Sequence, residues 1–230
     1  MISRSKEKCD EKLQKIKEKY PKVDVMSYGC DFSKITTLAD YRNLVKESGL
    51  MDVDIGILAL NAGLQARGHI DLIDDLPYQD IWSVNTIHVV YLLKALTEKL
   101  MSRDKRCAVL LTSSITATMQ MPGIAAYSAT KAAVSNLGEA IHFELKKNVD
   151  VTVWEPGFIE TKILVNAPPS VLTQSCEKAV GDILCSLGKT RNTKGSLRYD
   201  MYPLSIFNSS WWLSSDSACR RLEVETKKDQ

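Results

Sequence analysis

The 230-residue sequence is 44% hydrophobic and 25% charged, a balance typical of a globular protein with a sizeable core. Its formal net charge of +2 gives no indication of a nucleic-acid partner. The six cysteines form no CxxC pair and the three histidines lack ligand spacing, so we expect no metal site and reduced, intracellular thiols. No run approaches the roughly 18 apolar residues of a membrane-spanning helix, and we expect no signal peptide.

The N-terminal part of the chain predicts two helices separated by a strand. A Lys/Glu-rich helix is expected over residues 6–20, with Ser5 as its N-cap. A strand over 23–31 follows, and a second helix is expected over 37–48.

The middle of the chain alternates short apolar runs with longer amphipathic ones. The expected elements are a strand at 54–60, a helix at 78–101, a strand at 107–111, a helix at 125–147 and a strand at 149–154. Beyond residue 161 the pattern predicts a helix over 175–187 and a loop, with or without a final strand, over 192–200. The aromatic segment 202–213 is far too short to span a membrane.

This alternation predicts a parallel sheet covered by helices on both faces. Right-handed crossovers bring the carboxyl ends of all its strands to one edge, where ligands bind in such folds. Chemically interesting residues follow each predicted strand, so we expect a site at that edge; they are Arg4, Asp31, Asn61-Ala62-Gly63, Ser114 and Pro156-Gly157.

The segment from Ser114 to Lys131 carries the strongest chemical signal. Tyr127 and Lys131 are four residues apart in a predicted helix and therefore share one face. A nearby ammonium favours the phenolate, so we expect a lowered Tyr127 pKa and general acid chemistry. A Tyr-x-x-x-Lys pair alone is common by chance; the serine at its distance and the motifs below make it specific.

Ser114, Tyr127 and Lys131 together resemble the catalytic signature of the short-chain dehydrogenase/reductase family. Asn61-Ala62-Gly63 is similar to the end of the family's NNAG motif, and Pro156 to Thr161 is similar to its PGxxxT segment. Asn85 matches the helix asparagine of its catalytic tetrad. The resemblance covers roughly residues 1–165 and implies a Rossmann-like, three-layer, doubly wound parallel α/β sheet.

The resemblance also implies a mechanism, namely hydride transfer from a nicotinamide to a carbonyl carbon. Tyr127 would protonate the carbonyl oxygen and Ser114 would hold it. Lys131 would lower the Tyr127 pKa and bind the nicotinamide ribose, while Asn85 would anchor a water that relays protons to Lys131.

The same resemblance assigns the cofactor contacts. Ile159 and Thr161 would hold the nicotinamide carboxamide, Asn61 would line the cofactor site, and Asp31 would meet the adenine amino group. Arg4 stands beside the adenosine ribose, where an arginine suits the 2′-phosphate of NADP. We therefore predict NADP(H) as the cofactor and a reductase.

Within the family, the opening ISRS, the AYSATK block and the WEPGFIETK segment look most like very-long-chain 3-oxoacyl-CoA reductases and 17-beta-hydroxysteroid dehydrogenases. This likeness implies a lipid-like substrate. The terminal KKDQ has the spacing of a dilysine retrieval signal, which agrees with the cytosolic face of the endoplasmic reticulum membrane, with a cytoplasmic location as the alternative. The 78–101 and 125–147 helices resemble those that pair in the family's dimers, so a homodimer is expected.

Two departures from the family pattern stand out. The TGxxxGxG turn that binds the pyrophosphate is absent, so about one βα unit, including a central strand, is missing from the sequence as given. Leu60 stands where NNAG has its first asparagine. We therefore divide the chain into an incomplete Rossmann-type domain, 1–200, and a C-terminal tail, 201–230.

Other interpretations stay open beside this one. The chain could be an inactive or truncated relative that binds without turnover, or a dehydrogenase of small alcohols. Asn85 could be a satisfied core amide, Asp31 a cap of the following turn, and Arg4 a solvated side chain. The three histidines are expected at the surface or an interface; they are His69, His88 and His142.

Overall fold

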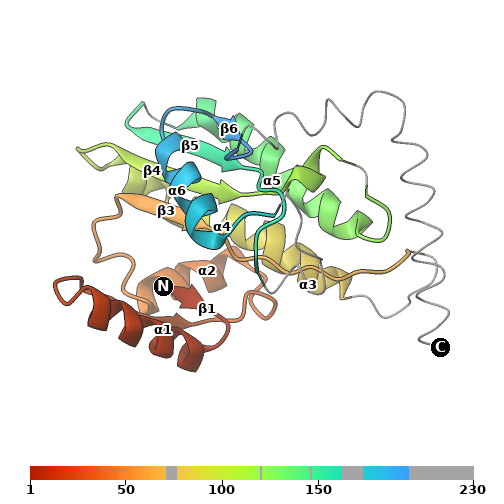
Figure 1. The fold of residues 1–230 in the computed structure, drawn as a ribbon. Helices are drawn as coiled ribbons and strands as arrows, with labels where there is room; N and C mark the ends of the chain where they lie inside the picture. Colours follow the sequence, from red (N-terminus) through yellow and green to blue (C-terminus); the bar gives the residue numbers. More distant parts are fainter. Residues whose placement is uncertain (71–76, 120, 146, 162–172, 197–230) are drawn as a thin grey trace.

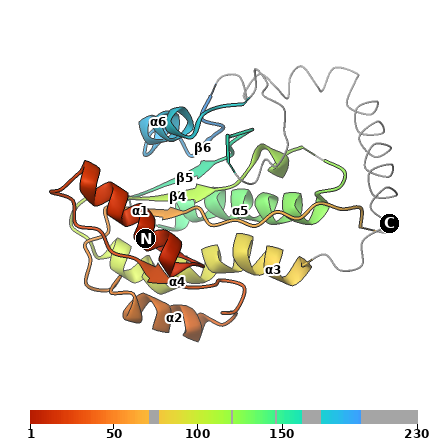
Figure 2. The same cartoon turned by 60° about the horizontal axis from the view of Figure 1, so that its bottom comes forward.

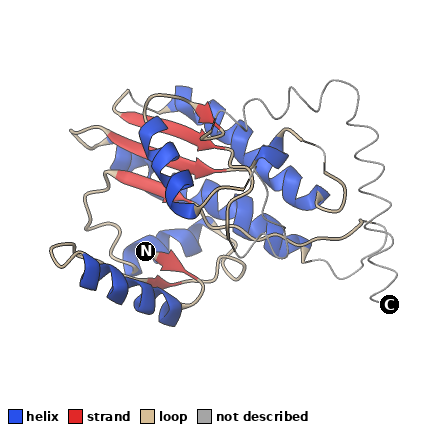
Figure 3. Cartoon of the chain, viewed as in Figure 1, coloured by secondary structure: helices blue, strands red, loops and turns tan. Residues whose placement is uncertain are grey.

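The computed structural model describes residues 1–70, 77–119, 121–145, 147–161 and 173–196. Its main sheet has four parallel strands in the order β3 (Ile57–Leu60), β4 (Cys107–Thr112), β5 (Val149–Trp154) and β6 (Asn192–Thr193). Their arrowheads point the same way in Figure 3, so their carboxyl ends share one edge. The predicted parallel α/β sheet is confirmed.

Helices cover both faces of this sheet and give three layers (Figures 1 and 2). On one face lie α2 (Leu38–Glu47), α4 (His88–Met101) and α5 (Ala125–Glu144). On the other lies α6 (Cys176–Ser186), with α1 (Lys6–Lys19) on the same side.

Helices α1, α2 and α6 begin at polar side chains that bind their first free backbone N–H groups. Ser5 caps α1 and Ser175 caps α6, each accepting a bond from a backbone nitrogen three residues on. Thr37 and Asp40 form a capping box at the start of α2. Such caps each contribute about 1 kcal/mol, and Ser5 is the N-cap that the sequence predicted for α1.

The core fills the space between the central strands and the helices. Val109, Leu111 and Val153 are fully buried in the larger cluster, with Leu96 and Val134 from the covering helices. A second, smaller cluster lies under α6 and consists of Leu110, Trp154, Ala179 and Ile183. Burial on both faces explains why these strands are almost continuously apolar.

The N-terminal strands form a separate sheet. β1 (Ile2–Ser3) pairs in parallel with β2 (Tyr28–Gly29), and among the described residues neither pairs with β3. The strand predicted over 23–31 is thus reduced to two residues, because β1 offers only two residues to pair with. Ile57, on the edge strand β3 of the main sheet, is 53% exposed.

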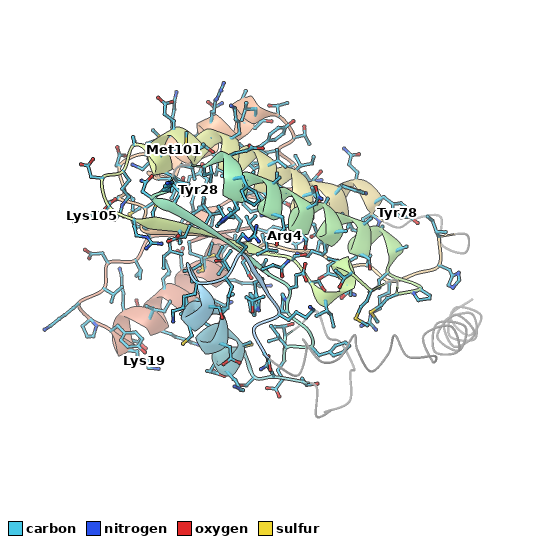
Figure 4. All side chains as sticks on the ribbon, turned by 90° about the horizontal axis from the view of Figure 1, so that it is seen from above. Arg4, Lys19, Tyr28, Tyr78, Met101 and Lys105 are labelled. Carbon is cyan, nitrogen blue, oxygen red and sulfur yellow. The ribbon has the colours of Figure 1, made fainter. Side chains whose placement is uncertain are left out.

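The long helix predicted over 78–101 is continuous but not uniform. It consists of α3 (Tyr78–Trp82), a π-helical turn (Ser83–Ile87) and α4, and Figure 4 labels Tyr78 and Met101 at its two ends. The π turn widens the helix at Asn85, and π turns are frequent at functional sites.

His88 corrects a prediction, because it lies in the core rather than at the surface. It is 1% exposed and its ring stacks on Phe32 at a centroid distance of 4.8 Å.

Among the described residues, no helix is long and apolar enough to cross a membrane. The 201–230 tail, with its aromatic segment and KKDQ, lies outside the described residues.

Candidate active site

The carboxyl end of β4 places Ser114 over the sheet edge. The backbone nitrogen of Ser113 bonds Trp154 O at 2.7 Å, and that of Ile115 bonds Pro156 O at 3.0 Å, so the two strand ends are tied together. Ser114 then caps a short 3-10 helix (Ile115–Ala117), and its Oγ accepts from the backbone nitrogen of Thr116 at 3.2 Å.

Tyr127 faces this serine from the first turns of α5. Its side chain is 9% exposed. Burial raises the Tyr127 pKa, and the neighbouring Ser114 hydroxyl opposes that rise. The prediction of a lowered pKa is therefore wrong for this state, because desolvation outweighs the effect of Ser114 and Lys131 does not contribute.

Lys131 lies one turn further along α5 and is 3% exposed. Its Nζ donates to Thr112 O at 2.8 Å and lies 5.7 Å from the centroid of the Tyr127 ring. Burial lowers the Lys131 pKa to about 8. At neutral pH most of the population therefore keeps the positive charge while the amine remains close to titration.

Asn85 holds the loop after β3 against α5. Its Oδ1 accepts from Leu64 N at 2.7 Å, and its Nδ2 donates to Leu64 O and to Thr130 Oγ1, each at 2.9 Å. The side chain is 1% exposed, so the interpretation as a satisfied core amide is correct as far as the side chain goes. Gly63 sits directly above it: a Cβ there would lie 3.6 Å from Asn85 Oδ1 and 3.5 Å from Lys131 Nζ.

A cavity of about 580 Å³ opens at this edge. Most of the predicted site residues line it. Those that do are Asn61, Ser114, Tyr127, Lys131, Ile159 and Thr161. Asn85 lies beneath it, behind Gly63. At the cavity wall, the backbone of Gln174 pairs with Phe158 and Glu160.

Arg4 and Asp31 lie outside this cavity, at the carboxyl ends of β1 and β2 (Figure 4 labels Arg4). Asp31 Oδ1 accepts from the backbone nitrogen of Ser33 at 3.0 Å and from its hydroxyl at 2.9 Å, which is a turn cap. The backbone bond is the largest cause of the lowered Asp31 pKa, and Arg4 contributes further. The two side chains are therefore electrostatic neighbours.

Several residues of the site were not predicted from the sequence. Arg67 and Gln65, in the loop that follows Gly63, line the cavity, as does Cys176 at the start of α6. Arg67 is a charged residue a few positions beyond the end of the predicted strand 54–60, and that position could have indicated it.

A buried polar network beneath the site was also missed. Ser113 Oγ donates to Lys131 O at 2.7 Å, and Ser135 Oγ lies 2.7 Å from both Ser113 Oγ and Glu155 Oε1. Asn192 Nδ2 completes it with a 3.1 Å bond to Glu155. The network ties α5 to the ends of three strands next to Lys131.

Parallel strands whose carboxyl edge carries a buried Ser-Tyr-Lys set define a Rossmann-type oxidoreductase domain. The family model for short chain dehydrogenases matches residues 1–171. The chain belongs to the short chain dehydrogenase family, whose members use NAD(P)(H).

Individual relatives agree with this assignment. The chain is 29% identical over 219 residues to the very-long-chain 3-oxoacyl-CoA reductase of Homo sapiens, and the match covers 93% of this chain and 68% of that protein. A solved 7beta-hydroxysteroid dehydrogenase is similar with a TM-score of 0.75 and 23% identity, covering 97% of this chain and 85% of that one. A short-chain dehydrogenase from Sphingobium yanoikuyae in complex with NADPH gives a TM-score of 0.74 at 21% identity, covering 94% and 84%. These structures support the fold.

Proposed function

We propose that this protein is an NADPH-dependent reductase of a carbonyl group on a lipid-like substrate, either a 3-oxoacyl-CoA or a steroid ketone. The observation that carries the proposal is the meeting of Ser114, Tyr127 and Lys131 in one cavity. Much of the remaining lining is apolar and suits an aliphatic or steroid body; it includes Ile115, Met121, Ile124, Trp154 and Val180.

The chemical states of the three residues suit carbonyl reduction. Because burial raises its pKa, Tyr127 keeps its proton at neutral pH and has it available for the carbonyl oxygen. Ser114, which lines the same cavity, would hold that oxygen. Once the proton has left, the ammonium of Lys131 stabilises the phenolate by the attraction of opposite charges.

The cofactor would supply the hydride. Support for its nicotinamide end comes from Gly63, because the absent side chain leaves space beside Lys131 Nζ. Lys131 and Tyr127 would contact the ribose, Ile159 and Thr161 the carboxamide, and Asn61 the cavity wall beside them. At the other end Arg4 would bind a 2′-phosphate and Asp31 the adenine; the glycine-rich pyrophosphate turn is absent from the sequence as given.

In this proposal Asn85 acts through its neighbours. By fixing both backbone groups of Leu64, it would keep Gly63 against Lys131, and it would anchor a water that relays protons to that lysine. Association into homodimers through α4 and α5, and residence on the endoplasmic reticulum membrane, are further proposals. Sedimentation of the purified chain and imaging of a fusion with and without Lys227 and Lys228 would test them.

The test is reduction of a 3-oxoacyl thioester with NADPH by the wild-type chain and by Tyr127→Phe. We expect a loss of about 10²–10⁴-fold in kcat for the variant, the usual contribution of a general acid. Tyr20→Phe, a change at a half-exposed tyrosine in the turn after α1, is the matched control and should keep full activity. Equal rates for Tyr127→Phe and wild type would reject the assigned role.

A second candidate, a relative that binds without turnover, is favoured by one observation, the missing TGxxxGxG turn. Trp154 lines the cavity, so its fluorescence should report occupancy. A saturable change on titration with NADPH supports the reductase; no change would favour the binding-only candidate. Turnover of short alcohols alone, without any acyl thioester reduction, would instead identify an alcohol dehydrogenase.

A further inference from the structure

The charged side chains that line the described part of the cavity all have the same sign. Among the described residues that line it, Arg67 and Lys131 are the charged ones, and both are cations. A cleft lined by charge of one sign concentrates ligands of the opposite sign. The Lys131 ammonium is already bonded to Thr112 O, whereas Arg67 makes no hydrogen bond or ion pair with any described residue. Of these two cations, Arg67 is therefore the one whose N–H donors have no partner among the described residues.

The position of Arg67 separates it from the proposed cofactor contacts. The backbone nitrogen of its neighbour Gly68 donates to Gly123 O at 2.8 Å, which fixes Arg67 beside the loop that leads into α5, four residues before Tyr127. Arg4, the proposed phosphate contact, lies outside the cavity. Arg67 thus belongs to the part of the cavity next to the proton donor, where the substrate body would lie.

We propose that Arg67 is a specificity-determining residue and that the substrate carries an anionic group, a phosphate or a carboxylate, in addition to its carbonyl. This inference rests on the proposed function and narrows it. A CoA thioester carries phosphates, whereas a steroid ketone is neutral. The planar guanidinium has five N–H donors in a fork that matches phosphate and carboxylate oxygens. Arg67 is exposed, and among the described residues it has no ion pair that would have to break before it accepts such a group.

Two matched pairs of ligands test the charge requirement directly. Acetoacetyl-CoA and the acetoacetyl thioester of N-acetylcysteamine share the reacting carbonyl but differ in the phosphates. Levulinate and its methyl ester differ in one carboxylate. Dissociation constants of all four would be measured by titration calorimetry for wild type, Arg67→Ala and Arg67→Lys. Arg42→Ala, at an exposed position on α2, is the control for loss of one positive charge.

For wild type we expect tighter binding of the anionic member of at least one pair. Arg67→Ala should reduce that preference at least tenfold, Arg67→Lys should recover part of it, and Arg42→Ala should leave it unchanged. The pair that responds identifies phosphate or carboxylate as the recognised group. High salt should weaken the preference of wild type as it does other exposed charge interactions.

Equal preferences in wild type and Arg67→Ala for both pairs would overturn the inference. The proposed reductase activity is judged separately, from NADPH oxidation by the wild-type chain. Arg67-dependent binding of the anionic ligands without turnover would reject the reductase and keep the role of Arg67. Turnover with a preference for anionic ligands that does not depend on Arg67 would keep the reductase and reject the role of Arg67.

Discussion

The ammonium of Lys131 donates a 2.8 Å hydrogen bond to the carbonyl oxygen of Thr112, at the last residue of β4. The lysine therefore joins helix α5 to the sheet edge at the site itself. Because it is 3% exposed, its charge is held where water is largely excluded. This contact holds α5 against the end of β4 through the side chain of Lys131.

Replacement of Lys131 by Met should remove a pH dependence of stability. Burial lowers the Lys131 pKa from 10.5 to about 8, so between these pH values the unfolded chain binds more protons than the folded one. The free energy of unfolding of wild type should therefore rise with pH through this window, by on the order of 3 kcal/mol in total. Urea unfolding at several pH values measures this slope.

Lys94→Met is the control for that measurement, because Lys94 is exposed on α4 and its loss removes the same formal charge. We expect the Lys94→Met curve to follow wild type, and the Lys131→Met curve to be flatter. Parallel curves for all three proteins would show that Lys131 is not desolvated to this degree.

Gly138 sets how closely α5 packs on the sheet. A Cβ at this position would lie 2.2 Å from Val153 Cγ2 and 2.9 Å from Leu111 Cδ1, and both partners are fully buried. Gly138→Ala should therefore destabilise the fold by about 1–3 kcal/mol, the usual effect of overpacking. It should also reduce activity, because the helix that moves carries Tyr127 and Lys131.

Gly181→Ala is the matched change on α6, where an added Cβ meets nothing within 4 Å. Removing a glycine from a helix interior there should stabilise the protein by roughly 0.5–1 kcal/mol. The unfolding temperatures of Gly138→Ala and Gly181→Ala, each compared with wild type, test both expectations. A stabilising effect of Gly138→Ala would mean that α5 stands further from the sheet.

The elements and the reactive set were predictable because their signals are local in the sequence. Apolar runs between amphipathic helices indicate a parallel sheet, and the spacing of Ser114, Tyr127 and Lys131 falls within one strand–helix unit. Burial of His88 was not predictable, because it depends on Phe32, which arrives from the loop after β2. The same holds for the Tyr127 pKa, which is decided by the depth of the side chain rather than by its distance in sequence from a lysine.

Ser135 tests whether the network beneath Lys131 stabilises the fold. Its hydroxyl lies 2.7 Å from Glu155, which is 3% exposed, so Ser135→Ala should leave a buried carboxyl short of a partner. We expect a loss of about 1–3 kcal/mol. Ser128, on the same helix, has a buried hydroxyl with no partner among the described residues, and Ser128→Ala should be neutral or stabilising. Equal changes in the free energy of unfolding for the two variants, measured by chemical denaturation, would show that the network does not stabilise the fold.

His88 should make the protein sensitive to acid. Burial is the main cause that lowers its pKa from 6.5 to about 4, and the charge of Lys131 adds to it. Between these pH values the unfolded chain binds more protons, so the free energy of unfolding falls as the pH is lowered from 6.5 to 4, by on the order of 3 kcal/mol. His88→Leu cannot take up that proton, and its unfolding free energy should change less over this range. His142→Leu, a change at a half-buried histidine of α5, should retain the wild-type acid sensitivity. Urea unfolding between pH 4 and 7 separates the two variants, and an unchanged acid response in His88→Leu would assign the sensitivity to other groups.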